Sequence, residues 1–214
     1  MNFSDKKIVF LGDSITHGDC IENRDNSYVN TVIREMGFKK AFNYSVPGSR
    51  IAEYIGEDPK KIGPSFVKRF SGMEDDADIV VVFGGTNDFG IGNEPVGAED
   101  DETDSTLCGG LNILMKGLCE KYPSAKIIVI TPLHRKNENE PNKFSGEPFI
   151  SYISAIRAAA KKYNAKLLDL YGDKDLQPSD EYYDALIIND GLHPNTEGHR
   201  VIADKLIEFI KKLY

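Results

Sequence analysis

The sequence predicts an α/β fold, a three-layer α/β/α sandwich with a central, mostly parallel five-stranded sheet. Three observations indicate it: short aliphatic runs recur along the chain, segments with helical spacing of apolar residues lie between them, and the two kinds of segment alternate from end to end. Strands that are apolar at every position are typical of a sheet covered on both faces. We expect right-handed crossovers and a single domain over residues 1–214.

Four of the five strand candidates are continuous apolar runs, and each stops at or just before a Gly or a Pro. The remaining one, at 41–44, is shorter and weaker. The candidates are residues 8–11, 41–44, 78–83, 126–131 and 166–170.

Four helices are predicted from apolar residues spaced three or four apart. They cover residues 28–36, 107–118 and 150–160 and a last segment from 196 onward. Gly37 is placed to end the first helix, Pro148 suits the first position of the third, and Asn195 is a candidate N-cap for the last. Gly109 and Gly110 weaken the prediction for the first turn of the second helix.

Composition excludes some classes of partner. The formal net charge is -8 at pH 7, and the Lys and Arg residues form no basic stripe, so neither nucleic acid nor an anionic membrane is an expected partner. The three cysteines show no metal-binding spacing, which predicts free thiols and a reducing compartment. The first apolar run is too short for a signal peptide or a membrane span, so the chain as written is expected in the cytoplasm.

Polar residues that suit acyl-transfer chemistry follow the predicted strands. Ser14 comes just after the first strand and Gly12, and Asn87 follows the third strand. Asp190 and His193 are three residues apart on a turn before the last helix. A carboxylate at that spacing can hold the imidazole in the tautomer that accepts a proton from a serine. Ligands bind beyond the carboxyl ends of parallel strands, where these residues should meet.

Four short motifs in this order resemble the blocks of the SGNH, or GDSL-type, hydrolase family. They are Gly-Asp-Ser at 12–14, the glycine that ends Ser-Val-Pro-Gly at 45–48, Gly-x-Asn-Asp at 85–88 and Asp-x-x-His at 190–193. Each block alone is common, but all four in sequence are specific, and they span almost the whole chain. The resemblance implies a flavodoxin-like arrangement of the sheet and a serine esterase.

The resemblance also implies a role for each residue. Ser14 would be the nucleophile, His193 its base, and Asp190 the group that orients the imidazole. The oxyanion hole would consist of the backbone N–H groups of Ser14 and Gly48 and the side-chain amide of Asn87. At position 48 a side chain would obstruct the substrate, which is why a glycine is expected there.

Asp13 and Asp88 lie beside these residues, and the family pattern implies that they fix turns rather than take part in the reaction. His17 is near Ser14 but has no acidic partner as well spaced as Asp190 is for His193, so we set it aside as the base. His134 is expected in a solvated loop and His199 on the surface of the last helix.

Two insertions are expected to border the groove, at 90–105 and 134–147. Five aromatic residues near the predicted site are candidates for its walls: Phe89, Phe144, Phe149, Tyr182 and Tyr183. The acidic stretch at 99–104 lacks the glycine and the terminal glutamate of a calcium loop, so a solvated surface loop is expected there. No metal and no organic cofactor is expected.

The leading hypothesis is hydrolysis of a small acyl ester, above all removal of an acetyl group from a carbohydrate or a similar polar compound. The alternative within the same mechanism is a lysophospholipase or an acyl-CoA thioesterase. A non-catalytic binding module of the same fold is a third hypothesis, disfavoured because a binding domain needs no paired base and nucleophile. The expected partner is a small-molecule ester, and the sequence does not indicate an oligomeric state.

Overall fold

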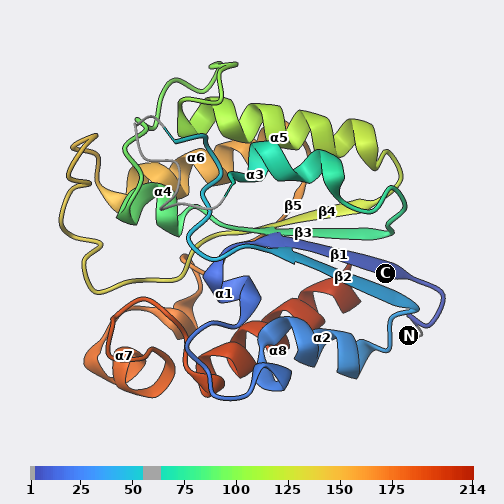
Figure 1. Ribbon diagram of the computed structural model, residues 1–214. Coiled ribbons are helices and arrows are strands. Elements are labelled where there is room, and N and C mark those ends of the chain that lie inside the picture. The colour runs from blue at the N-terminus through green and yellow to red at the C-terminus, as the bar shows by residue number, and fades with distance from the viewer. Residues whose placement is uncertain (1–2, 55–63) are drawn as a thin grey trace.

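The computed structural model describes residues 3–54 and 64–214; residues 1–2 and 55–63, which the predicted domain range includes, lie outside the described residues. Five parallel strands form one sheet in the order β2-β1-β3-β4-β5. Helices cover both faces of this sheet (Figure 1). The predicted three-layer α/β/α class is therefore confirmed.

All five predicted strands are present. They are β1 (Lys7–Gly12), β2 (Lys40–Ser45), β3 (Ile79–Phe83), β4 (Lys126–Ile130) and β5 (Lys166–Leu168). In the centre of the sheet, Ile8 of β1 lies opposite Ala41 of β2 and Ile79 of β3. Residues 79–83 are buried at every position, as expected for a strand between two helix layers.

The four longest helices are the four predicted ones, and four short helices lie at strand ends or in connections. The helices of the described residues are α1 (Ser14–His17), α2 (Tyr28–Met36), α3 (Phe66–Arg69), α4 (Thr86–Gly90), α5 (Leu107–Lys121), α6 (Phe149–Lys162), α7 (Asp180–Leu186) and α8 (Thr196–Lys212), with 3₁₀ turns η1 (Arg24–Asn26), η3 (Phe70–Gly72) and η4 (Lys174–Leu176). Within the described ranges, none of the helices is both long enough and apolar enough to cross a membrane.

Helix ends follow the predicted signals with one shift. Gly37 adopts a left-handed conformation at the end of α2, and the Asn195 side chain accepts the N–H of Gly198 at the start of α8. Pro148 was expected at the first position of α6, but it occupies the N-cap position, one residue earlier. The helix therefore begins at Phe149.

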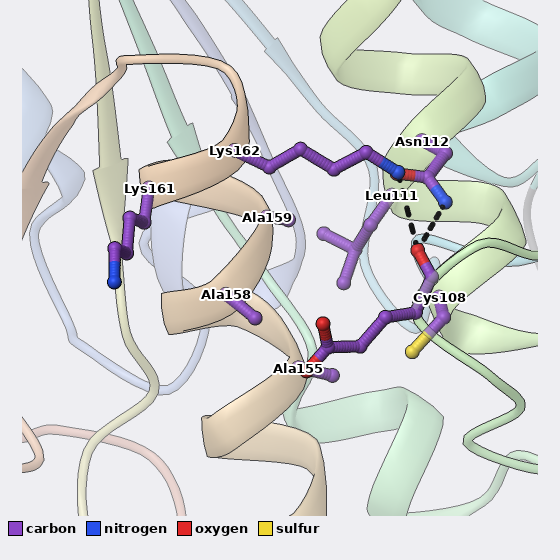
Figure 2. Close-up of a pocket in the computed structure, with 9 residues that line it drawn as sticks. Cys108, Leu111, Asn112, Ala155, Ala158, Ala159, Lys161 and Lys162 are labelled. Atoms are coloured by element: carbon purple, nitrogen blue, oxygen red, sulfur yellow. Dashed lines mark hydrogen bonds between the residues drawn. The ribbon is translucent and has the colours of Figure 1, made fainter.

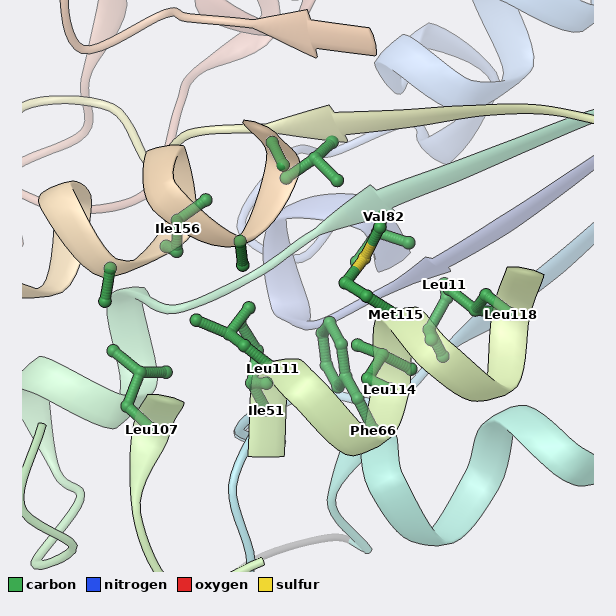
Figure 3. Packing of buried hydrophobic residues seen from close by; sticks show 14 of the residues in the cluster. Leu11, Ile51, Phe66, Val82, Leu107, Leu111, Leu114, Met115, Leu118 and Ile156 are labelled. Atoms are coloured by element: carbon green, nitrogen blue, oxygen red, sulfur yellow. The ribbon is translucent and has the colours of Figure 1, made fainter. Parts of the chain in front are cut away.

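The two faces of the sheet carry separate hydrophobic cores. One face packs against α3, α5 and α6, and the other against α2 and α8 (Figure 1). In the first core, Leu11 of β1 and Val82 of β3 pack against Leu111 and Leu114 of α5, beside Phe66 of α3 (Figure 3). Burying one such side chain stabilises the fold by about 1.5–3 kcal/mol.

The two glycines in the first turn of α5 allow close packing. A Cβ on Gly109 would lie 1.9 Å from the Thr103 carbonyl oxygen, and one on Gly110 would lie 3.0 Å from the Cα of Ala52. The helix forms despite the low helical propensity of glycine because the backbone segments at 52 and 103 occupy the space of a side chain. These contacts fix α5 beside the loop that follows β2.

The strand order creates a topological switch point at the carboxyl ends of β1 and β3. From β1 the chain first adds β2 on one side and then crosses to add β3 on the other side of β1. Connections leave β1 and β3 in opposite directions at this point, which is where open α/β sheets bind their ligands. In Figure 1, α1 and α4 begin at this edge of the sheet.

Candidate active site

Three side chains form a hydrogen-bonded chain at this edge of the sheet. The Ser14 hydroxyl lies 2.9 Å from Nε2 of His193, although the two residues are 179 positions apart in the sequence. Nδ1 of the same ring lies 2.5 Å from Oδ2 of Asp190. A carboxylate only accepts, so Nδ1 carries the proton and Nε2 presents a lone pair to the Ser14 hydroxyl. This arrangement can draw the proton from a serine.

The position of Ser14 is set by the tight turn between β1 and α1. Oδ1 of Asp13 accepts the N–H of Ile15 at 3.0 Å and caps α1. A Cβ on Gly12 would lie 2.0 Å from Oγ1 of Thr16, so only glycine allows the strand and the helix to approach so closely. Asp13 therefore helps to fix this turn, the role that the family resemblance implies for it.

Burial raises the pKa of Asp13 to about 7. The Ile15 N–H and the neighbouring His193 ring favour the ionised form, and the Asp88 carboxylate opposes it. The side chain is 2% exposed. Asp13 thus titrates near neutral pH, next to Ser14.

The turn that carries His193 is held by the same carboxylate that orients the ring. Oδ1 of Asp190 accepts the backbone N–H groups of Leu192 and His193, each at 2.9 Å. Gly191 has a φ of +71°, a backbone conformation that favours glycine. Partial burial opposes ionisation of Asp190, but the hydrogen bonds from the ring and the two N–H groups outweigh it and lower the pKa of the carboxyl group.

Asn87, a candidate oxyanion donor, is tied to the loop that carries Gly48. Nδ2 of Asn87, at the start of α4, donates to the Ser49 carbonyl at 3.1 Å. An amide has two N–H groups, so one is used to hold the loop after β2 and the other is left to bind a ligand. Both Oδ atoms of Asp88 accept the N–H of Ile51, at 3.0 Å. Asn87 and Asp88 together fix the backbone that follows Gly48.

The local reason for glycine at position 48 is its backbone conformation. Gly48 has a φ of +73°, and a Cβ built there would meet no protein atom within 4 Å. The left-handed φ requires glycine regardless of any substrate. Beside it lies open space, in which an acyl group can be placed.

Several residues that support this loop carry no motif in the sequence. Arg69 of α3 donates to the carbonyl of Tyr44. It also donates to the carbonyl of Gly12 at 3.2 Å and to the hydroxyl of Ser49 at 2.8 Å. It links the ends of β1 and β2 to the Gly48 loop. In the sequence Arg69 directly follows Lys68, and two adjacent cations are typical of an exposed face.

Directly after Ser49, Arg50 is buried and pairs with Glu94. Its Nη1 lies 3.0 Å from Oε2 of Glu94, and the two side chains are 2% and 0% exposed. A buried pair of this kind restricts the backbone more than it stabilises the fold. It ties the Gly48 loop to the segment after α4.

Two of the three histidines that we set aside lie elsewhere than expected. His199 of α8 is fully buried, not at the surface, and its Nδ1 accepts the N–H of Tyr28 at 3.2 Å. Because α2 packs on α8, this helix face is covered. Burial lowers the pKa of His199 to about 4, so the ring is neutral at physiological pH. His17 binds Oδ1 of Asp19 through Nδ1 at 2.6 Å.

His134 is likewise buried, at 4% exposure, and not in a solvated loop as predicted. Its Nδ1 lies 2.9 Å from Oε1 of Glu138, and its Nε2 lies 3.0 Å from the Tyr171 carbonyl. Glu138 also accepts the N–H of Arg135 at 3.0 Å. The ring therefore organises the loop at 134–147 from within.

The insertion at 134–147 borders the site. The N–H of Lys136 donates to the Gly191 carbonyl at 2.9 Å, within the turn that carries His193. Nδ2 of Asn142 donates to the carbonyl of Phe89 at 2.6 Å and to that of Gly92 at 3.1 Å, and the second bond joins this insertion to the segment at 90–105. A shift of the insertion would therefore reach the turn of His193 directly.

The candidate aromatic walls divide into buried and exposed residues. Phe89, Phe149 and Tyr182 belong to the buried cores, so these three do not form walls as proposed. Phe144 is 69% exposed. Tyr183 is half-buried and lies under Nζ of Lys136, 5.7 Å from the ring centroid.

One pocket lies away from all of these residues. It has a volume of about 430 Å³ and is formed between α5 and α6 (Figure 2). Lys162 closes one side by donating to Oδ1 of Asn112 at 2.9 Å, and Asn112 in turn donates to the Glu99 carbonyl at 3.0 Å. Ser14, Asn87 and His193 do not line it.

Comparisons with known proteins concern the family and the fold of the chain. The sequence model of the GDSL-like lipase/acylhydrolase family matches residues 10–201, while no curated protein matches the chain. By structure the chain is similar to a protein from Lactobacillus plantarum, with 27% identity, 100% of this chain and 99% of that chain covered, and a TM-score of 0.83.

Two further solved structures are more distant. One is a possible lipase from Chitinophaga pinensis, with 20% identity, 98% of this chain and 99% of that chain covered, and a TM-score of 0.73. The other is an acetyl xylan esterase, with 23% identity, 94% and 98% of the two chains covered, and a TM-score of 0.62. At these identities the likeness concerns the fold.

Proposed function

The chain belongs to the GDSL-like lipase/acylhydrolase family, and on that premise we propose that it is a serine esterase that removes a small acyl group, above all acetyl, from a carbohydrate or a similar polar alcohol. The observation that carries the proposal is the chain of contacts from the Ser14 hydroxyl through the His193 ring to Asp190, at 2.9 and 2.5 Å. A non-catalytic binding module would not need this series of contacts.

In the proposed reaction, Oγ of Ser14 attacks the ester carbonyl while Nε2 of His193 takes the hydroxyl proton. Base catalysis of this kind contributes about 10²- to 10⁴-fold. Asp190 stays ionised and stabilises the imidazolium. The imidazolium then protonates the departing alcohol, and a water molecule activated by the same ring releases the acid and restores Ser14.

Three donors would stabilise the oxyanion of the tetrahedral intermediate. The backbone N–H of Ser14 belongs to the first turn of α1, where N–H groups have no partner within the helix. The N–H of Gly48 and the second N–H of the Asn87 amide complete the set. Because Asn87 also holds the Ser49 carbonyl, two of the donors are fixed relative to each other before substrate arrives.

Two observations support a polar substrate with a short acyl group. The first is the similarity of the fold to that of an acetyl xylan esterase. The second is a shallow groove of about 540 Å³ beside the carboxyl end of β2, lined among others by Ser45, Lys68 and Arg69. Ser45 begins the segment that leads to Gly48, and the polar lining of the groove suits a polar alcohol.

Labelling with a fluorophosphonate tests the nucleophile, because only an activated hydroxyl reacts quickly. We expect fast, stoichiometric labelling of the wild type and none of Ser14→Ala. Ser151→Ala is the matched control, since the Ser151 hydroxyl donates to a Glu147 carboxylate at 2.9 Å instead of contacting an imidazole, and it should label like the wild type. A wild type that reacts no faster than Ser14→Ala would refute the esterase and favour the binding module.

The acyl group is tested with p-nitrophenyl esters from acetate to decanoate, acetylated sugars, a lysophospholipid and an acyl-CoA, with Ser14→Ala as the blank. We expect kcat/KM to be highest for acetate and to fall with chain length. Rates that rise from acetate to decanoate would instead support the lysophospholipase or thioesterase alternative with the same mechanism.

A further inference from the structure

An exposed thiol lies next to the His193 and Asp190 pair. Three potential metal-binding atoms, one each from Cys20, Asp190 and His193, lie within 4.8 Å of one another. Among the described residues this is the sole group of three or more Cys, His, Asp or Glu side chains that could hold a metal ion. Cys20 is on the loop after α1 and has a φ of +69°, unusual for a residue other than glycine. This backbone places the thiol beside the turn at 190–193, although 170 positions separate Cys20 from Asp190 in the sequence.

The three side chains match the preferences of a borderline-soft divalent cation. Thiolate, imidazole and carboxylate are the protein ligands of Zn²⁺, and a site with three of them leaves one position for water. Tetrahedral bonds of about 2.0–2.3 Å put two ligand atoms roughly 3.5 Å apart. Because the donor atoms lie within 4.8 Å of one another, they need to approach by at most about 1.3 Å. If the cation takes Nδ1 of His193, that atom and Oδ2 of Asp190, now 2.5 Å apart, move apart by about 1 Å instead. Both shifts are within the reach of side-chain rotation on an exposed loop.

Access and charge also suit a cation. Cys20 and Asp190 are exposed and His193 is half-buried, so an ion reaches them without opening the fold. Burial and the carboxylates of Asp190 and Asp19 raise the pKa of the Cys20 thiol. The negative charge that disfavours a free thiolate attracts a cation, and metal binding then displaces the thiol proton.

We propose that Zn²⁺ or a similar thiophilic divalent cation binds at Cys20, Asp190 and His193 and reversibly inhibits the hydrolase. The proposed binding of the cation depends only on this geometry, whereas the proposed inhibition rests on the proposed function. The cation is an inhibitor and not a cofactor, because each of its possible positions on the His193 ring removes the base.

If the cation binds Nε2, it occupies the lone pair that accepts the Ser14 proton. If it binds Nδ1, the ring proton must move to Nε2, which then donates instead of accepting. In both cases the Cys20 thiol loses its proton to solvent as the sulfur–metal bond forms. No bond to carbon is made or broken and nothing is oxidised, so a chelator restores the original state.

Binding is tested on Ser14→Ala, which cannot hydrolyse ester. Co²⁺ is the probe, since a thiolate bound to Co²⁺ gives a charge-transfer absorption in the near ultraviolet. We expect this absorption in Ser14→Ala, its loss on adding Zn²⁺, which binds such sites more tightly, and its absence in Ser14→Ala/Cys20→Ser. In Ser14→Ala/Cys119→Ser, which lacks a thiol of α5, the absorption should persist. No absorption, or absorption that survives Cys20→Ser, would overturn the site.

Inhibition is measured separately on active protein, each variant relative to its own rate with chelator. The Zn²⁺ concentration for half-inhibition should rise at least about 10-fold in Cys20→Ser, because loss of a metal ligand costs no less than loss of a supporting contact, and should be unchanged in Cys119→Ser. Equal sensitivity of Cys20→Ser and the wild type would refute the inhibition. If the protein hydrolyses no ester, the proposed function fails, yet the Co²⁺ spectrum still decides the site.

Discussion

Replacing Asp13 by asparagine should change how stability depends on pH. Asp13 is 2% exposed and burial raises its pKa to about 7, against 3.8 for an ordinary aspartate. Between these two values the unfolded chain has lost the proton and the folded chain still holds it. Stability therefore falls as the pH rises from about 4 to about 7 and levels off above that range. The amide of Asp13→Asn would keep an acceptor for the Ile15 N–H but would not titrate.

The magnitude follows from the difference of about 3 pKa units. At about 1.4 kcal/mol per unit, ionisation of Asp13 costs the wild type about 4 kcal/mol by pH 7. The stability of Asp13→Asn relative to the wild type should therefore increase by up to about 4 kcal/mol across this range. Every other titrating group that does not contact Asp13 cancels in this comparison.

The measurement is urea unfolding of both proteins at half-unit intervals from pH 4.5 to 8, with the slope m held common to the pair. Asp13→Ala serves as the matched control. It also lacks the titration but loses the cap on α1, so its curve should run parallel to that of Asp13→Asn and about 1 kcal/mol lower. A difference between Asp13→Asn and wild type that stays constant within about 1 kcal/mol over this range would refute the account of Asp13.

Three other changes have defined outcomes. Asp190→Asn should lower kcat/KM for p-nitrophenyl acetate by about 10²- to 10⁴-fold with little change in Tm, because an amide can present its NH₂ to Nδ1 and shift the proton to Nε2; less than a tenfold loss would contradict the role of Asp190. Asn87→Ala should lower kcat by about 10²- to 10³-fold with a smaller effect on KM, and an unchanged kcat would remove Asn87 from the oxyanion hole. Burial lowers the pKa of His199 to about 4, so the neutral ring contributes stability that is present above pH 6.5 and falls by about 3 kcal/mol as the pH drops to 4. His199→Gln should lack this loss in the same urea series. A pH dependence identical to that of the wild type would refute this role of His199.

The opposite signs of the Asp13 and His199 effects make the wild-type curve uninformative. Over the same range, about pH 4 to 7, one group destabilises the fold as pH rises and the other stabilises it by a similar amount. In the wild-type profile these two contributions offset each other, and the buried carboxyl groups of Asp88 and Glu94, whose pKa burial also raises, add to the decline with rising pH. The two contributions become visible in the variants.

The sequence was sufficient for the strands and the long helices because their signals are local. An aliphatic run that stops at Gly or Pro identifies a buried strand wherever it packs. The short helices α1 and α4 escaped prediction since four or five residues show no period. Their effect on the site is large, because α1 begins at Ser14 and α4 carries Asn87.

Contacts between distant segments are the part that the sequence could not reveal. His199 looked exposed because nothing in α8 shows that Tyr28 of α2 covers it. Arg69 carries no motif, yet it joins three backbone segments at the site. Cys20 was assigned as an ordinary free thiol, and only the fold brings it to Asp190.

The separation of 179 positions between Ser14 and His193 has a consequence for biosynthesis. The hydroxyl leaves the ribosome long before the imidazole, so the two can meet only after the segment that carries His193 has been made. A nascent or proteolysed chain that ends before residue 193 would contain most of the sheet and yet be inert toward esters. Ester turnover would therefore serve as a stringent reporter of complete synthesis and folding.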